Sequence, residues 1–221
     1  MVSIQMLDKI QNYERCFFEE LPDDIEFHCR RVGIYSRIVA SNMLQLLSKA
    51  YPGMRTGQIL EAVQLGGCYH DIGKVVCRAD ILDKNKGLSK AEQEALKNHS
   101  LRSAEIIAGN EKFKNIKGVS GDAYKRTIFN CCLYHHEQYN GKGYPKKLAG
   151  RAIPLEAQIV SACNMFDILI SDCGYKEQQK INRAMDIIIA ESGKSFAPKV
   201  VKTFRESHKE LGTALYFMKS L

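Results

Sequence analysis

Apolar residues recur at helical spacing along most of this 221-residue chain, with polar residues between them. The longest stripe begins at Ile25 and ends at Leu47, and its apolar side chains lie three or four positions apart. The sequence YPGM at 51–54 interrupts this pattern, because proline and glycine disfavour a continuing helix. A second helix is expected from about Thr56 to His70, so the amino-terminal third predicts two long helices.

The remainder of the chain continues this alternation of helices and short loops. Ser89 and Glu92 form the capping box SKAE, which predicts a helix that starts there and runs past His99. Another helix is expected over about 123–137, and Pro154 suits the first turn of the next one. Two or three more helices complete the chain. Since no segment has the period of a strand, we predict one all-helical domain spanning residues 1–221.

Composition narrows the classes of function. Lysines and arginines exceed acidic residues by seven, but they are spread along the chain. This distribution favours a phosphorylated small molecule over nucleic acid as a partner. No apolar run approaches the roughly 20 residues that span a bilayer, and the amino terminus is unlike a signal peptide. The eight cysteines are scattered without a CxxC pair. We therefore expect a cytoplasmic protein with reduced thiols and no membrane partner.

Histidines mark the candidate chemistry. Five of the six lie inside the expected helices or at their ends, and only His208 stands apart. A single buried histidine is ordinarily a core residue, but several helices here each supply one, and Asp71 adds a carboxylate. Imidazole with carboxylate suits zinc, iron, manganese or nickel. Because His135 and His136 are roughly 100° apart on a helix, they favour a wide site with more than one metal.

Two motifs in combination identify a family resemblance. HDIGK at 70–74 and HHEQYNGKGYP at 135–145 resemble the HD-GYP branch of the HD metal-dependent phosphohydrolases. The segments around His99, after Pro154 and at GKSFAPKVV are also similar to that family, so the resemblance covers roughly residues 24–205. It implies an all-α HD-domain bundle of about seven to nine helices. It also implies hydrolysis of cyclic di-GMP or a related nucleotide at a centre of two or three divalent metals, iron or manganese.

The resemblance assigns roles to individual residues. The implied metal ligands are His28, His70, Asp71, His99, His135 and His136, with Asp24 at the position of a ligand to a third metal. Asp71 and Lys74 are the implied catalytic pair, with Asp71 bridging two metals and Lys74 contacting a substrate phosphate. The implied substrate contacts further include Lys176 and the signature loop, of which Gly141, Gly143, Tyr144 and Pro145 are part.

Several positions depart from the family pattern. Asn164 replaces a ligand aspartate, although its amide oxygen can still reach a metal, while Asp167 matches a second aspartate that is not the usual ligand. Cys173 and Gln158 each replace an arginine. The family's arginine at the position of Cys173 binds phosphate. Glu137 is either a partner that orients a ligating histidine or a solvated residue. Two hypotheses follow: a phosphodiesterase, or a degenerate domain that binds a nucleotide or a protein partner in signalling.

Overall fold

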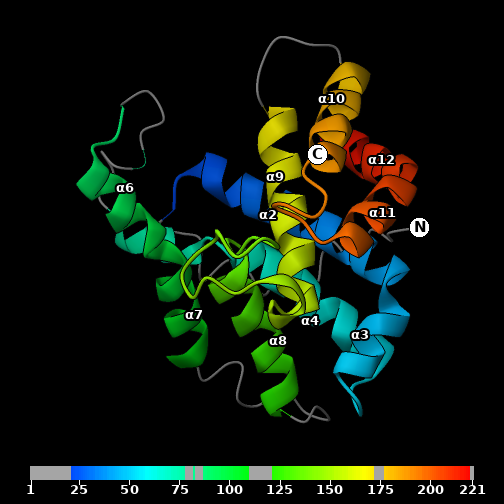
Figure 1. The fold of residues 1–221 in the computed structure, drawn as a ribbon, viewed down its shortest axis with the longest axis horizontal. Helices are drawn as coiled ribbons and strands as arrows, with labels where there is room; N and C mark the ends of the chain where they lie inside the picture. Colours follow the sequence, from blue (N-terminus) through cyan, green and yellow to red (C-terminus); the bar gives the residue numbers. More distant parts are fainter. Residues whose placement is uncertain (1–20, 78–81, 83–86, 110–120, 172–176, 220–221) are drawn as a thin grey trace.

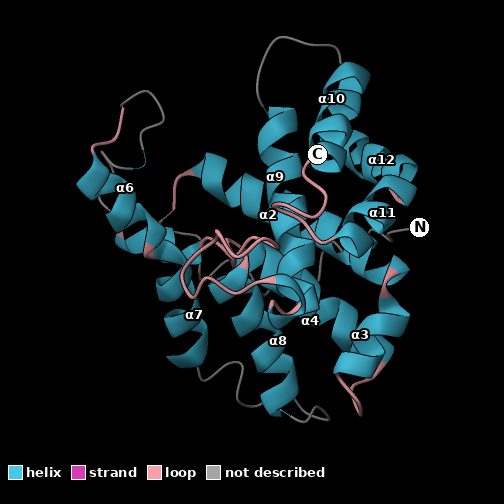
Figure 2. Cartoon of the chain, viewed as in Figure 1, coloured by secondary structure: helices cyan, strands magenta, loops and turns pink. Residues whose placement is uncertain are grey.

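The computed structural model of the protein describes residues 21–77, 82, 87–109, 121–171 and 177–219. These residues form helices joined by loops, with isolated bridges in place of named strands (Figure 2). The all-α class expected from the sequence is therefore confirmed. Within the described residues, no helix has both the length and the apolar character needed to cross a membrane.

The amino-terminal stripe forms two helices, and not one. Helix α2 spans Asp23–Asn42 and α3 spans Leu44–Ala50. They are separated at Met43, whose φ of −112° and ψ of 11° leave the helical region. The apolar stripe continues across this break, because the side chains of Met43 and Leu47 are both buried in the core. Helix α4 then spans Thr56–Tyr69, as predicted.

The later elements also follow the apolar pattern. They are η1 (Ile72–Val76), α6 (Lys90–Lys97), α7 (His99–Gly109), α8 (Gly121–Tyr134), η3 (Gly150–Ala152), α9 (Leu155–Ser171), α10 (Glu177–Ala190), α11 (Pro198–Glu206) and α12 (His208–Lys219). The Ser89–Glu92 capping box is present in both directions. The helix that it starts ends before His99, however, which corrects the prediction of one helix running past that residue. Asn98 separates the two helices.

Helix α2 lies across the centre of the molecule and packs against α4 and α9, while α4 packs against α8 (Figure 1). Helix α7 packs against α8 and η1. Helices α10, α11 and α12 pack against one another. Phe166 of α9 is fully buried, with its ring edge-on to those of Tyr35 and Phe204. One continuous apolar core therefore fixes the helix ends that carry the histidines.

Candidate metal centre

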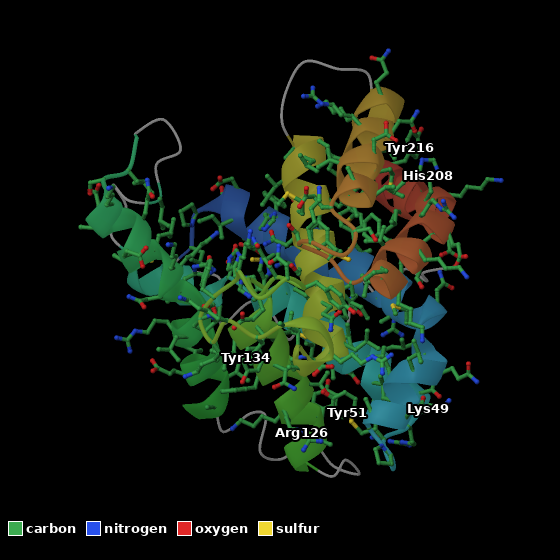
Figure 3. All side chains as sticks on the ribbon, viewed as in Figure 1. Lys49, Tyr51, Arg126, Tyr134, His208 and Tyr216 are labelled. Carbon is green, nitrogen blue, oxygen red and sulfur yellow. The ribbon has the colours of Figure 1, made fainter. Side chains whose placement is uncertain are left out.

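Five of the candidate ligands sit where helices begin or end. His70 and Asp71 occupy the junction between α4 and η1, His99 is the first residue of α7, and His135 and His136 directly follow α8. Backbone in such junctions turns away from the helix axis, so side chains from different helices can converge. His208 begins α12 and lies apart from α7 and α8 (Figure 3), as the sequence suggested.

Four ligands form a first group. The ligand atoms of Asp71, His99, His135 and His136 all lie within 4.8 Å of one another. The Nε2 atom of His99 is 3.3 Å from Nε2 of His135, 3.2 Å from Nε2 of His136 and 3.0 Å from Oδ1 of Asp71. Three imidazole nitrogens and one carboxylate oxygen thus point at one small volume, as in a transition-metal site.

Backbone carbonyls set the tautomers of three rings. The Nδ1 atoms of His70, His99 and His135 lie 2.7, 2.6 and 2.9 Å from carbonyl oxygens of Gly67, Leu96 and Cys132, respectively. A carbonyl oxygen only accepts, so Nδ1 carries the proton and donates it. The neutral ring then has its lone pair at Nε2, directed at the cluster. Metal-ligating histidines are held in this way by a hydrogen bond from the other ring nitrogen.

Burial keeps the rings of His70, His135 and His136 neutral. Desolvation lowers the pKa of His70 and lowers that of His135 well below its ordinary value, with repulsion between neighbouring histidines adding to the effect on His135. It lowers the pKa of His136 to about 3, for which His99 is the next cause. Neutral imidazole is the form that binds a metal, so all three rings are ready to ligate near pH 7.

Asp71 joins the first group to a second. Its Oδ1 faces His99, whereas its Oδ2 lies 3.3 Å from Nε2 of His70 and 3.8 Å from Nε2 of His28. His28, His70 and Asp71 form the second group of ligand atoms within 4.8 Å. Burial opposes ionisation of Asp71, but its neighbours, among them the ammonium of Lys74, outweigh it and hold the pKa of the carboxyl well below its usual range. A carboxylate with one oxygen in each group suits a bridge between two metals.

Two polar atoms of this centre, and one of Asn164, lack hydrogen-bond partners within the described part of the chain. Nε2 of His70, Oδ1 of Asp71 and Oδ1 of Asn164 are all buried in this state. A buried polar atom without a partner costs roughly 1–3 kcal/mol, so such atoms are rare unless an ion or a ligand completes them. The residues present therefore fit divalent metals.

Two other predicted ligands, Asp24 and Asn164, lie on α2 and α9. Asp24 is exposed on α2 and belongs to neither group of ligand atoms, so its role in a third metal site stays a prediction. Asn164 is buried in α9, one turn before Asp167. Lys176 and Cys173 lie outside the described residues.

Asp167 connects α9 to α2. Its Oδ2 accepts a hydrogen bond from Nδ1 of His28 at 2.7 Å. Arg31 donates from Nε to Oδ1 at 2.7 Å and from Nη2 to Oδ2 at 2.8 Å. Burial raises the pKa of Asp167, but these two partners outweigh it and lower that pKa below its ordinary value. No role is predicted for Arg31 from the sequence; its place one turn after His28 on the same helix is the only available signal.

The signature loop folds over the first group. Tyr144 stacks on His136, with ring centroids 4.6 Å apart and an interplanar angle of 20°. A Cβ on Gly143 would lie 2.3 Å from the backbone nitrogen of Gln138, so only glycine fits there. Pro145 follows Tyr144 through a cis peptide bond. The loop thereby lays an aromatic ring across one side of the histidine cluster.

Glu137 holds this loop, which corrects both interpretations of it from the sequence. Its side chain is buried. Oε1 accepts from the backbone nitrogen of Lys146 at 2.6 Å, and Oε2 accepts from that of Leu148 at 2.9 Å. Glu137 therefore neither orients a histidine nor faces solvent. It ties the loop to the end of α8, where His135 and His136 are located.

Comparison with known proteins agrees with this geometry. Residues 52–200 match the family described as HD domain. The chain belongs to the HD-domain family, in its HD-GYP branch. It is 31% identical over 150 residues to the cyclic di-GMP phosphodiesterase response regulator RpfG of Xanthomonas campestris, covering 67% of this chain and 37% of that protein. It is 30% identical over 184 residues to a cyclic di-GMP phosphodiesterase of Thermotoga maritima, covering 83% of this chain and 45% of that protein.

A relative whose name refers to another substrate is also similar to this chain, and so is a protein of solved structure. A 3'3'-cGAMP-specific phosphodiesterase of Vibrio cholerae is 28% identical over 141 residues, which cover 64% of this chain and 25% of that protein. The chain thus spans less than half the length of these curated relatives. The structure of Bd1817, an HD-GYP-type protein from Bdellovibrio bacteriovorus, superposes with a TM-score of 0.58 at 20% identity, covering 95% of this chain and 58% of that one. At that identity, the similarity establishes the fold.

Proposed function

We propose that this protein is a metal-dependent phosphodiesterase that hydrolyses a phosphodiester bond of a cyclic dinucleotide. The observation that carries the proposal is the pair of ligand groups that share Asp71, with one carboxylate oxygen in each. Two metals held by a shared carboxylate are the usual catalytic arrangement for this chemistry. The names of relatives, which refer to cyclic di-GMP and 3'3'-cGAMP, support the substrate class.

The donor set indicates which metals suit the site. His99, His135, His136 and Oδ1 of Asp71 would hold one ion, and His28, His70 and Oδ2 of Asp71 the other. Imidazole and carboxylate ligands suit iron and manganese, which we propose as the physiological metals. When bound, the metals would supply an activated water and polarise a phosphoryl oxygen.

The chain's own residues would bind and orient the substrate. The ammonium of Lys74 lies 2.5 Å from Oδ2 of Asp71, and although burial opposes its charge, Asp71 raises its pKa. Lys74 therefore stays charged beside the centre and can contact a phosphate oxygen. Tyr144 shields His136 from solvent on the loop side. These residues would place the phosphate against the ligand groups and limit the access of bulk water.

The alternative function is a degenerate domain that binds a nucleotide or a protein partner without hydrolysing a nucleotide. Asn164 favours it, because the implied ligand position carries no charge. Gln158 favours it too, because its amide donates to the carbonyl of Ile153 at 2.6 Å and so is engaged with the loop. The described helices share one core, and we propose that residues 1–221 act as one domain in either case.

Metal analysis combined with an activity assay tests the proposal. Protein purified without chelator under anaerobic conditions is expected to contain two transition-metal ions per chain. It is expected to convert cyclic di-GMP or 3'3'-cGAMP to a linear dinucleotide. Two bound ions with nucleotide binding but no hydrolysis would establish the degenerate domain, and the absence of metal would contradict both the site and the reaction.

A further inference from the structure

The four histidines that are anchored at Nδ1 are not held in the same way. His70, His99 and His135 donate to backbone carbonyls, which no substitution removes. His28 instead donates to the side chain of Asp167, which comes from a helix far away in the sequence. The orientation of His28 therefore depends on whatever fixes that carboxylate.

Arg31 is the group that fixes it. Its guanidinium contacts both oxygens of Asp167, at 2.7 and 2.8 Å, as a fork matched to the carboxylate plane. The carboxylate is fully buried, whereas the side chain of Arg31 is 26% exposed at the edge between α2 and α9. With both oxygens engaged, the carboxylate cannot rotate about its terminal bond without breaking two charge-assisted hydrogen bonds. Oδ2 thus stays directed at Nδ1 of His28.

The second ligand group has little to replace His28. It consists of His28, His70 and Asp71, and Asp71 is shared with the first group. Asn164, on the same helix as Asp167, contributes no negative charge. The ring of His28 is also less buried than that of His70, with 15% of its side chain exposed against none for His70. Packing therefore restrains His28 less than it restrains His70.

From these contacts we infer that Arg31 is a positioning residue for the second metal. Through Asp167 it holds Nε2 of His28 toward Oδ2 of Asp71, and it thereby sets the affinity of the second ion without contacting that ion. The three histidines of the first group, His99, His135 and His136, take no part in this chain of contacts. This inference rests on the two-metal centre proposed above.

Manganese titration of the full chain tests the role of Arg31. After chelator treatment, the wild type is expected to bind two Mn²⁺ ions by calorimetry and to give the electron paramagnetic resonance signal of a coupled pair. Arg31→Gln is expected to bind the second ion about tenfold more weakly, as for loss of a group that orients a ligand. Its first ion should bind as in the wild type, and the coupled signal should give way to that of a single ion.

Three further variants complete the test. Arg30→Gln is the matched control, because Arg30 lies on the same helix and pairs with Glu26 at similar exposure. It should keep both ions. Asp167→Asn should weaken the second ion at least as much as Arg31→Gln. Arg31→Lys should weaken it by an intermediate factor, because an ammonium keeps the charge but not the fork.

The outcomes separate this inference from the proposed function. Fewer than two ions in the wild type would overturn the two-metal centre itself. If the wild type binds two ions and Arg31→Gln binds each of them as tightly as the wild type does, the role of Arg31 alone would be overturned. If Arg31→Gln does not fold, Arg31→Lys decides: a second ion as tight as in the Arg30→Gln control overturns the inference, and a weaker one supports it.

Discussion

The Nε2 atoms of His99 and His135 lie 3.3 Å apart, and both rings donate Nδ1–H to backbone carbonyls. Two neutral rings with this tautomer direct lone pairs at each other, which is unfavourable unless a cation lies between them. A proton could also satisfy the pair, but burial lowers the pKa of His135 and disfavours the charged ring. The space between these two rings is thus suited to a metal ion, and a proton on His135 is disfavoured.

The stability of the chelator-treated protein should therefore fall as the pH drops below about 6.5. His70, His135 and His136 have lowered pKa values in the folded state, so the unfolded chain takes up protons first. A histidine that stays neutral only in the folded state reduces the free energy of unfolding by about 1.4 kcal/mol for each pH unit below its ordinary pKa. For His136 this loss continues to about pH 3. Urea unfolding between pH 7 and 4 measures it.

Comparison of variants isolates the contribution of His136. His136→Gln should flatten the pH dependence, whereas His208→Gln, at the separate start of α12, should leave the slope unchanged. Burial raises the pKa of Glu156, which opposes the trend in this window, but Glu156 is present in all three proteins and cancels in the comparison. Equal slopes for wild type and His136→Gln would contradict the assignment of a buried, neutral His136.

Asn164→Asp should increase the affinity of the centre for Mn²⁺. The buried Oδ1 of Asn164 has no hydrogen-bond partner within the described residues, and we predict that it faces the metals. A unit negative charge about 4 Å from a cation is worth roughly 4 kcal/mol at an effective dielectric constant of 20, so an increase of tenfold or more is expected. Calorimetric titration measures the affinity.

The same variant also separates the two proposed functions. If the wild type is a weakened enzyme, Asn164→Asp should raise the rate of cyclic dinucleotide hydrolysis together with metal occupancy. If the domain only binds, metal should increase without hydrolysis. Asn164→Ala serves as the control and should bind no more metal than the wild type. An unchanged affinity in Asn164→Asp would show that residue 164 does not face the centre.

Lys74→Ala should have opposite effects on the two kinds of ligand. Loss of the ammonium beside Oδ2 of Asp71 should leave Mn²⁺ affinity unchanged or raise it, because a competing positive charge is removed. Binding of inorganic phosphate to the metal-loaded protein should weaken by roughly 1.5–3 kcal/mol, the usual loss for a hydrogen bond between charged groups. Calorimetry measures both affinities.

Lys49→Ala is the matched control for the lysine experiment. Lys49 is exposed on α3, and Figure 3 shows it well away from Tyr134, the last residue of α8 before His135 and His136. This variant should change neither affinity. If Lys74→Ala also left phosphate affinity unchanged, a role for Lys74 in substrate binding would be excluded.

The sequence predicted the helices well, and it singled out the side chains that lie together in the first group, for physical reasons. Apolar periodicity reports which side of a helix is buried, and the two motifs placed four of the candidate ligands at helix ends. Periodicity does not report a one-residue interruption, so the break at Asn98 was missed. Spacing along a helix also predicts which way a side chain points, but not whether it is buried. Asp24 lies on the same side of its helix as His28 and is nevertheless exposed.

Contacts between distant segments were the part that the sequence could not supply. The role of Glu137 depends on the path of the loop that returns to it, and no local pattern reveals that path. Likewise, Arg31 reads as an ordinary residue of α2 until α9 brings Asp167 against it. Both residues act through tertiary pairing, which neither helical periodicity nor motif spacing encodes.

Gly73 provides a test of how the centre is assembled. A Cβ on Gly73 would lie 2.2 Å from the carbonyl oxygen of His99 and 2.5 Å from the backbone nitrogen of Ser103. Its own N–H donates to Oγ of Ser103 at 2.8 Å. Gly73→Ala must therefore push η1 away from α7 and separate Asp71 from His99. We expect a loss of roughly 1–3 kcal/mol in the free energy of unfolding, as for overpacking, and weaker binding of the first Mn²⁺ ion.

Gly57→Ala is the control for this substitution, because a Cβ at Gly57 in α4 meets no atom within 4 Å. It should stabilise the protein by about 0.4–1 kcal/mol through the unfolded state and leave metal affinity unchanged. Thermal unfolding and Mn²⁺ titration of both variants are the measurements. If Gly73→Ala lowered stability but bound the first ion as tightly as Gly57→Ala, the distance between η1 and α7 would not control that site.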